Sequence, residues 1–290
     1  MPTASTTHHA DHAAVLRSRV VAHDQVAEAT FRIRVDCPPL AARALPGQFA
    51  MLRLADRCDP LLARPLAVYD VFSDGIESRY ADFLYVVHGK FTRALADVRP
   101  GDELLVWGPL GNGFALPSAG HLLLVAGGIG QTALLALARE RLGRARYGLP
   151  ARTADPATRV TFCWGARTAA AFACTDDFRK AGCDVHLATL DGSTGTRGTV
   201  VDLLEERFAG GIAAADTRVA CCGPEPMMEA VAAWAAGRGI PCAVSLETPM
   251  ACGIGICFTC VARIRDADGG WDYRRTCVEG PVFDATRVVW

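Results

Sequence analysis

Four cysteines near the C-terminus have the spacing to hold an iron–sulfur cluster. Cys252, Cys257 and Cys260 follow the pattern C-x4-C-x2-C, and Cys277 comes after sixteen further residues. This is the spacing known for ligands of a binuclear cluster. The glycines within the pattern suit a loop that must gather three thiolates, because glycine tolerates a positive φ. We therefore predict a [2Fe–2S] cluster, which transfers one electron at a time.

The alternative metal is zinc. Structural zinc sites usually present two close pairs of ligands, as in C-x2-C…C-x2-C. Here one close pair has a third cysteine beside it and a distant fourth, as in plant-type ferredoxins. The other eight of the 12 cysteines are scattered without metal-ligand spacing. We favour iron–sulfur over zinc, and either metal over a set of buried, unliganded cysteines.

Chain length, net charge and the length of the apolar runs indicate which classes of protein fit this sequence. A chain of 290 residues can form two globular domains and a small module. The net charge of −1 and the lack of a basic block give no reason to expect a nucleic acid or a membrane surface as partner. The apolar runs are too short to span a bilayer, and the N-terminus lacks the features of a secretory signal. We expect a cytoplasmic protein in which residues 1–14 form a disordered tail.

The elements that position the cysteines change character along the chain. Residues 15–117 contain short β-rich stretches separated by turns, which predict a small antiparallel barrel. In residues 118–244 strands alternate with helices, which predicts a doubly wound parallel sheet. Residues 245–290 predict a small cluster module, so the fold class is β plus α/β. The expected strands include 30–35, 48–54, 66–72, 83–87, 103–107, 159–164, 184–190 and 218–222.

Two stretches of the predicted barrel carry groups suited to a pyrophosphate. Arg64, fixed beside Pro65 at a strand start, can reach a pyrophosphate with its planar guanidinium. The turn at residues 89–92 adds backbone donors if it opens a helix. An ordinary surface arginine and an ordinary turn are the alternatives, and neither motif identifies a ligand by itself.

Two turns fall at the carboxyl edge of the predicted sheet, where nucleotides bind in such folds. The first, G-G-I-G, follows a buried strand and opens a helix, so its amides can face a phosphate or a ring edge. The second, C-G-P, follows a later strand. Tight packing turns and core cysteines are the alternatives, and the missing G-x-G-x-x-G disfavours a usual Rossmann dehydrogenase. The residues concerned are Gly127, Gly128, Gly130, Cys222, Gly223 and Pro224.

Taken in order, these motifs resemble the ferredoxin–NADP reductase superfamily, which has an R-P-x-S/A flavin strand, then G-G-I-G and C-G-P. Within it the chain is similar to the electron-transfer subunits of NAD-dependent dihydroorotate dehydrogenase, in which the iron–sulfur module follows the nucleotide domain. The resemblance rests on SLETPMACGIGICFTCVARI, on YRRTCVEGPVFDA and on the loop DGSTGTRGTV. It covers nearly the whole chain from Val15 onward.

The resemblance implies FAD on the barrel, NAD on the second domain and an FMN-containing dihydroorotate dehydrogenase catalytic subunit as partner, in a heterotetramer of two plus two. Electrons would pass from dihydroorotate through FMN, the cluster and FAD to NAD, in pyrimidine biosynthesis. A flavin must stand between cluster and nicotinamide because it exchanges both one and two electrons. No catalytic acid or base is expected here. By position the flavin contacts are Arg64, Pro65, Leu66, Ala67, Leu84, Tyr85, Val86, Phe91 and Thr92.

The chain departs from this family in two places. Phe91 stands where a glycine is common, and residues 131–133 replace prolines, so the flavin contact and the nicotinamide pocket are expected to differ. The choice of NAD over NADP rests on resemblance, because Arg167 is either a 2′-phosphate ligand or an ordinary exposed residue. Two other functions stay open: a related NAD(P)H:acceptor reductase subunit serving hydrogenase or ferredoxin, and a non-enzymatic nucleotide-binding protein with a structural zinc.

Overall fold

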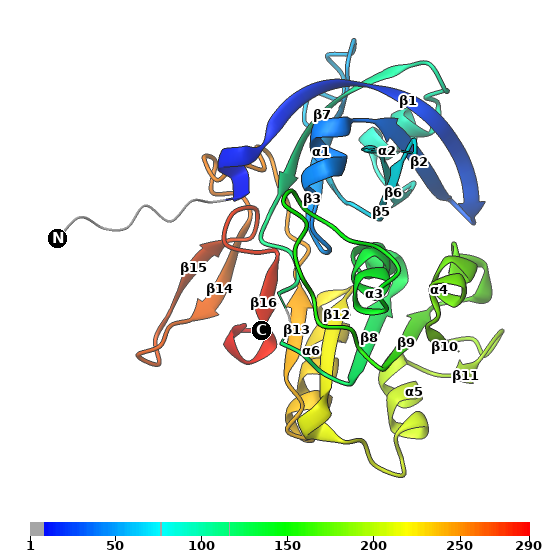
Figure 1. Ribbon diagram of the computed structural model, residues 1–290, viewed down its shortest axis with the longest axis vertical. Helices are drawn as coiled ribbons and strands as arrows, with labels where there is room; N and C mark the ends of the chain where they lie inside the picture. Colours follow the sequence, from blue (N-terminus) through cyan, green and yellow to red (C-terminus); the bar gives the residue numbers. More distant parts are fainter. Residues whose placement is uncertain (1–8, 76, 116) are drawn as a thin grey trace.

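Two seven-stranded sheets and a separate hairpin make up the fold (Figure 1). The computed structural model describes residues 9–75, 77–115 and 117–290. Within these ranges no helix has both the length and the apolar character needed to cross a bilayer. Of the predicted tail, residues 1–8 lie outside the described residues, whereas His9–His12 form a 3-10 helix and Ala14 begins the first strand.

The first sheet, called the barrel below, is antiparallel with the order β4-β3-β7-β1-β2-β6-β5. Alternation explains its strands: in β2, Ile33 and Val35 are buried, while Arg32 and Arg34 on the other face are half-buried. The predicted stretch 66–72 is divided between β4 and β5, and the sequence prediction did not single out the long β1. The bounds are β1 (Ala14–Ala27), β2 (Thr30–Asp36), β3 (Phe49–Leu54), β4 (Arg64–Ala67), β5 (Asp70–Ser73), β6 (Ser78–Val86), β7 (Glu103–Leu110), α1 (Pro38–Arg43) and α2 (Lys90–Ala96).

The second sheet has the order β11-β10-β9-β8-β12-β13-β16 and is parallel except for β16. Helices α3 and α4 pack on one face and α5 and α6 on the other, so two apolar clusters flank the sheet. The predicted doubly wound fold is thereby confirmed. The bounds are β8 (His121–Gly127), α3 (Leu135–Arg141), β9 (Arg159–Ala166), α4 (Thr175–Ala181), β10 (Asp184–Thr189), β11 (Thr196–Arg197), α5 (Val200–Arg207), β12 (Thr217–Cys222), α6 (Glu225–Ala236), β13 (Cys242–Ser245) and β16 (Val282–Asp284).

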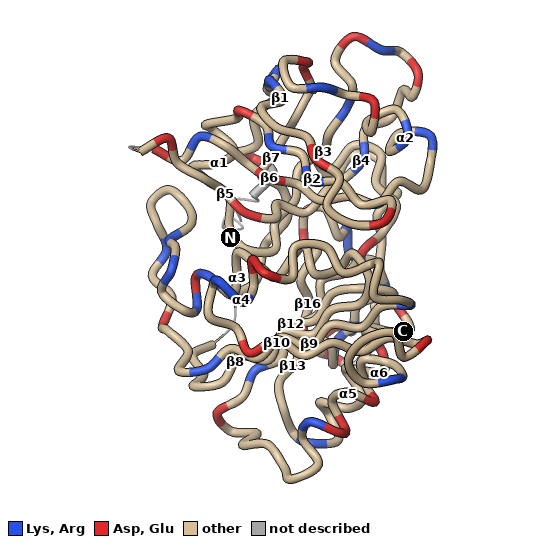
Figure 2. Tube along the Cα trace, turned by 90° about the vertical axis from the view of Figure 1, so that its right-hand side faces the viewer, with Lys and Arg blue, Asp and Glu red and all other residues tan. Residues whose placement is uncertain are grey.

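Acidic and basic residues are interspersed over both sheets (Figure 2), and some of them join the sheets. Arg32 of β2 donates to Asp177 of α4 at 3.1 Å. Arg139 of α3 pairs with the buried Asp70 of β5, which also accepts from the hydroxyl of Tyr147 at 2.7 Å. Because buried carboxylates are costly unless paired, these contacts fix how the second domain sits on the barrel.

The C-terminal segment is built into both sheets. After the hairpin of β14 (Val261–Arg265) and β15 (Trp271–Arg275), the chain returns as β16 and pairs with β13. Asn112, just beyond β7, donates to the carbonyls of Glu279 (3.2 Å) and Val282 (2.8 Å) and accepts from the Val282 amide (3.1 Å). One side chain therefore fastens the returning strand to the end of the barrel.

Replacing Asn112 with Ala should lower the free energy of unfolding by about 2 kcal/mol, because three partly buried hydrogen bonds are lost together. Urea denaturation measures the change. The control is Gln25→Ala, which removes one exposed hydrogen bond to Ala27 and should alter stability little. Equal stabilities for the two variants would show that Asn112 does not fasten the C-terminal segment.

Candidate cofactor sites

A cleft of about 960 Å³ lies where the barrel, the second sheet and the cysteine-rich loop meet. All nine residues that the resemblance assigned to the flavin line it. The opposite wall comes from the turn after β8, the end of β12 and the stretch after β13. A largely apolar cleft with a few polar groups is the usual form of a cofactor site. The residues of the opposite wall are Ile129, Thr132, Ala133, Cys222, Ser245, Leu246, Glu247, Thr248, Pro249, Met250, Ala251, Thr259 and Pro281.

Arg64 on the barrel wall fits an anionic ligand. Arg64 begins β4, and its guanidinium donates to the carbonyls of Leu62 and Ala63. Within the described part of the chain it has no carboxylate partner, so its remaining donors can face a phosphate. Thr92, in the first turn of α2, accepts from the Gly89 amide at 3.0 Å and donates to the Gly89 carbonyl at 3.2 Å, so its hydroxyl is engaged within its own turn. Phe91 is 1% exposed and packs in the barrel core.

The cysteine-rich loop brings the four predicted ligands together as two pairs. The sulfurs of Cys260 and Cys277 are 3.1 Å apart and buried. Cys252 and Cys257 form the second, more exposed pair, and the proximity of Cys252 contributes to the lowered pKa of Cys257. Among the described residues no group of three or more His, Cys, Asp or Glu side chains converges on one point as a single metal ion requires. Two pairs match a centre with two metal atoms, each taking two thiolates.

Two glycines hold this loop against its surroundings. Gly253 has φ +74°, and a Cβ atom on it would lie 2.6 Å from Cγ of Met51 in β3. Gly255 has φ +84°, and a Cβ there would lie 2.6 Å from Val278. The indole of Trp107 in β7 donates to the Cys252 carbonyl at 3.0 Å. The loop therefore packs closely against the barrel, a contact that the sequence did not predict.

Two cysteines of the loop, Cys257 and Cys260, differ electrostatically from the scattered ones. The Thr259 hydroxyl donates to Cys257 at 3.2 Å and, with the Thr259 amide, lowers the pKa of that thiol to about 6. Contact with Cys277 likewise lowers the pKa of Cys260 to about 6 and raises that of Cys277. By contrast, burial raises the pKa of Cys37, Cys163, Cys183 and Cys242 to about 12. Thiolates bind metals, so the two groups of cysteines are suited to different roles.

The two glycine turns of the second sheet pack directly on each other. A Cβ on Gly130 would overlap the Cys222 carbonyl, and one on Gly223 would lie 2.8 Å from the Gly127 amide. The turn after β8 opens a 3-10 helix, Gly128–Ala133, before α3 begins. Close packing restricts Gly127, Gly130 and Gly223, whereas a Cβ on Gly128 would meet nothing within 4 Å. Of the six residues predicted here for a nucleotide, only Cys222 lines the cleft.

Sequence reasoning missed several residues of the cleft. Glu247, whose pKa is raised by burial, approaches the Cys222 sulfur at 3.9 Å. Thr259 lies between two predicted ligands but was given no role. Glu247 lies in the stretch SLETPMACGIGICFTCVARI that carries the resemblance, and Thr259 stands between two predicted ligands, so their position was the available signal. Gln131 is fully buried, and neither atom of its amide has a hydrogen-bond partner in the described structure.

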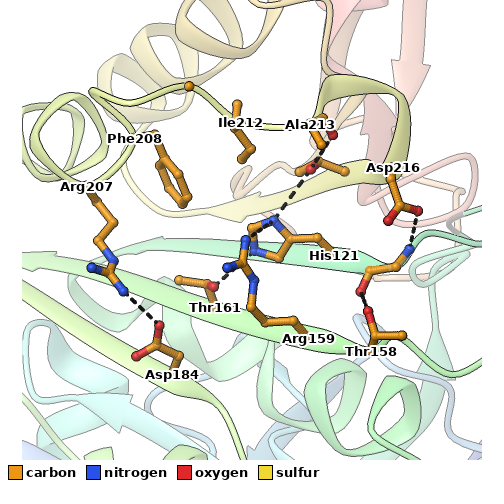
Figure 3. A pocket seen from close by; sticks show the side chains of 13 residues that line it. His121, Thr158, Arg159, Thr161, Asp184, Arg207, Phe208, Ile212, Ala213 and Asp216 are labelled. Carbon is orange, nitrogen blue, oxygen red and sulfur yellow. Dashed lines mark hydrogen bonds and ion pairs between the residues drawn. The ribbon is translucent and has the colours of Figure 1, made fainter.

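A second hollow, of about 580 Å³, opens at the opposite edge of the sheet, where β8, β9 and β12 begin (Figure 3). Its polar groups satisfy one another. His121 accepts from Arg159 at 3.0 Å and meets the Thr161 hydroxyl at 3.0 Å, while Arg207 pairs with Asp184 at 3.2 Å. Nucleotides bind at the other edge of such sheets, so this hollow belongs to the packing of the domain.

Burial and the neighbouring Arg159 lower the pKa of His121 to about 4, well below the value of about 6.5 in an unfolded chain. As the pH falls, His121 therefore takes up a proton in the unfolded state before it does so in the folded state. The contribution of His121 to the free energy of unfolding should be fully present above pH 6.5. It should decrease by up to about 3 kcal/mol as the pH falls from 6.5 to 4. Urea unfolding across this range should show a smaller acid loss in His121→Gln than in the wild type. Identical pH profiles would contradict this account of His121.

Comparisons with known proteins agree with this arrangement. A model of the iron-sulfur cluster binding domain of dihydroorotate dehydrogenase B matches residues 247–289. A model of the oxidoreductase NAD-binding domain matches residues 124–233. The chain is 37% identical over 278 residues to the dihydroorotate dehydrogenase B (NAD(+)) electron transfer subunit of Desulforamulus reducens, with 95% of this chain and 98% of the relative covered. The subunit of the same name from Bacillus caldolyticus is 36% identical over 276 residues, with 94% and 98% covered.

Solved structures give the same architecture. An NADH-dependent reduced ferredoxin-NADP oxidoreductase superposes with a TM-score of 0.75 at 29% identity, covering 94% of this chain and 90% of that one. A ferredoxin NADP+ reductase from Neisseria gonorrhoeae with bound FAD and NADP superposes with a TM-score of 0.60 at 15% identity, covering 78% and 92%, and shows the fold alone.

Proposed function

The chain belongs to the family of dihydroorotate dehydrogenase B (NAD(+)) electron transfer subunits, and on that premise we propose that it carries electrons from a dihydroorotate-oxidising partner to NAD in pyrimidine biosynthesis. One observation carries the proposal. A single cleft is lined by the predicted flavin residues of the barrel and by the loop that bears the predicted cluster ligands. Electron transfer between two cofactors requires that they be held close together, and a cleft lined by both sets of residues supports such an arrangement.

We assign the cluster ligands as two pairs, Cys252 with Cys257 and Cys260 with Cys277. The 3.1 Å contact between the sulfurs of Cys260 and Cys277 supports this assignment, as do the lowered thiol pKa values of Cys257 and Cys260. When bound, the cluster passes single electrons, and FAD converts them into the two-electron hydride chemistry of NAD. The chain's own task is to hold these groups in place and to shield the buried pair from water.

For FAD, the proposed contacts are the nine barrel residues that line the cleft, with Arg64 facing the pyrophosphate. For NAD, the proposed region is the carboxyl edge of the second sheet, with the turns at 127–130 and 222–224. Because those turns pack closely on each other, we propose that they form part of the surface against which NAD lies and do not wrap around its phosphates. The corresponding division is 15–117 for FAD, 118–244 for NAD and 245–290 for the cluster.

We propose an FMN-containing dihydroorotate dehydrogenase catalytic subunit as the partner, in a heterotetramer of two plus two. The surface beside the exposed pair of cysteines supports a partner there. Ile256 is 74% exposed and Phe258 is 62% exposed, although both are large apolar side chains. The cytoplasm is the proposed compartment, since ligand cysteines must stay reduced before they take up metal.

The test is co-purification with the FMN-containing partner, followed by cofactor analysis and an assay of NAD reduction by dihydroorotate. We expect NADH formation that requires both subunits together. A complex loaded with FAD, FMN, iron and sulfide that fails to reduce NAD with dihydroorotate would refute this function and favour a reductase serving another partner.

Replacing Cys277 with Ser should reduce or abolish the bound iron and sulfide, because a buried thiolate ligand is lost, while FAD binding to the barrel remains. Iron, sulfide and FAD content, measured on the purified complex, gives the result. The control is Cys58→Ser, an exposed cysteine outside the cysteine-rich loop, which should keep all three. Full retention of iron and sulfide in Cys277→Ser would overturn the ligand assignment.

A further inference from the structure

Thr259 contacts both of the proposed cofactor sites. It lies between Cys257 and Cys260, and its hydroxyl donates to the Cys257 sulfur at 3.2 Å. The same residue lines the cleft assigned to the flavin. Neither the cluster ligands nor the flavin contacts predicted from sequence include it. A polar side chain placed between the two sites can act on both.

The backbone holds Thr259 in this position at some cost. Phe258, the preceding residue, has φ +56°, in the left-handed region that a bulky side chain adopts at a cost of about 1–2 kcal/mol. Arg275 fixes the strained residue. Its guanidinium lies 5.1 Å from the centre of the Phe258 ring and donates to the Gly255 carbonyl at 3.0 Å. Such strain persists only where surrounding contacts impose it, so the turn that directs Thr259 back toward Cys257 is imposed by the fold.

We propose that the Thr259 hydroxyl raises the reduction potential of the cluster by donating a hydrogen bond to the sulfur of Cys257. This inference rests on the proposed function, because it requires Cys257 to be a cluster ligand. Reduction adds one electron and makes the ligand sulfurs more negative, so a donor to sulfur stabilises the reduced form more than the oxidised form. No bond breaks, and the hydroxyl proton stays on Thr259 throughout.

The position of Thr259 gives this hydrogen bond a functional consequence. Cys257 belongs to the more exposed pair of thiols, where water competes for the sulfurs, whereas Cys260 and Cys277 are buried. A donor supplied by the protein adds a hydrogen bond to this sulfur whose direction is set by the turn at Phe258. Thr259 is thus a positioning residue that acts on the cluster through Cys257.

The test uses the holoenzyme with Thr259→Val, which keeps the shape of the side chain and removes the hydroxyl. The midpoint potential of the cluster is measured by EPR-monitored redox titration. We expect the ratio of reduced to oxidised cluster at a fixed potential to fall about tenfold, a shift of about 59 mV to more negative values for one electron. Thr259→Ser keeps the donor and should stay near the wild type.

The matched control is Thr132→Val. Thr132 lines the same cleft from the turn after β8, and its hydroxyl meets no cysteine sulfur in the described structure. This variant should leave the midpoint potential of the cluster unchanged. A shift equal to that of Thr259→Val would show that any change in the cleft alters the potential, and it would overturn the inference. An unshifted midpoint in Thr259→Val, with iron and sulfide complete, would also overturn it.

Failure of the inference is distinguishable from failure of the proposed function. A wild-type protein without iron and sulfide would contradict the proposed function itself, whereas an unshifted midpoint in an iron-loaded variant contradicts only the role of Thr259. Should Thr259→Val lose its iron, Thr259→Ala carries the same test, since it also lacks the hydroxyl and adds no branched side chain. A wild-type midpoint in iron-loaded Thr259→Ala would overturn the inference.

Discussion

The contact between the cysteine-rich loop and the wall of the barrel is the constraint on which the rest of the site depends. At Gly253 the loop backbone lies so close to Met51 that a single added carbon would overlap it, and Trp107 holds the carbonyl of Cys252 from the same wall. The ligands therefore cannot move away from the barrel. A metal centre bound by these thiols lies beside a cofactor bound by the barrel. Electron transfer requires such a short distance between the two.

The remainder of the fold maintains that contact from two directions. From one side, β16 returns into the second sheet, and Asn112 fastens the returning chain to the end of β7. From the other side, the ion pairs of Asp70 and Asp177 hold the second domain on the barrel. Cys222 and Glu247 thereby line the same cleft. The segment 245–290 carries its own motif but is structurally an extension of both larger domains.

Local patterns in the sequence predicted most of the elements and all four candidate ligands. Short β-rich stretches located β2 and β3, and the apolar run at residue 121 located β8. The long β1 was missed as a single strand, because its pairing with both β2 and β7 is decided by neighbours far away in sequence. For the same reason the mutual packing of Gly130 and Cys222, and the reach of Thr259 into the cleft, could not be inferred. Such contacts join segments that are far apart in the sequence, and no local pattern indicates that they meet in the fold.

The central claim is that the four thiols hold a binuclear iron–sulfur cluster that exchanges electrons with the flavin beside it. Anaerobic addition of NADH to the purified protein, followed by optical and EPR spectroscopy together with metal and sulfide analysis, tests this most directly. The account predicts two iron and two sulfide per FAD, with NADH bleaching the flavin and producing the EPR signal of a reduced [2Fe–2S] cluster in the same molecule. A colourless protein with stoichiometric zinc and no acid-labile sulfide would contradict it.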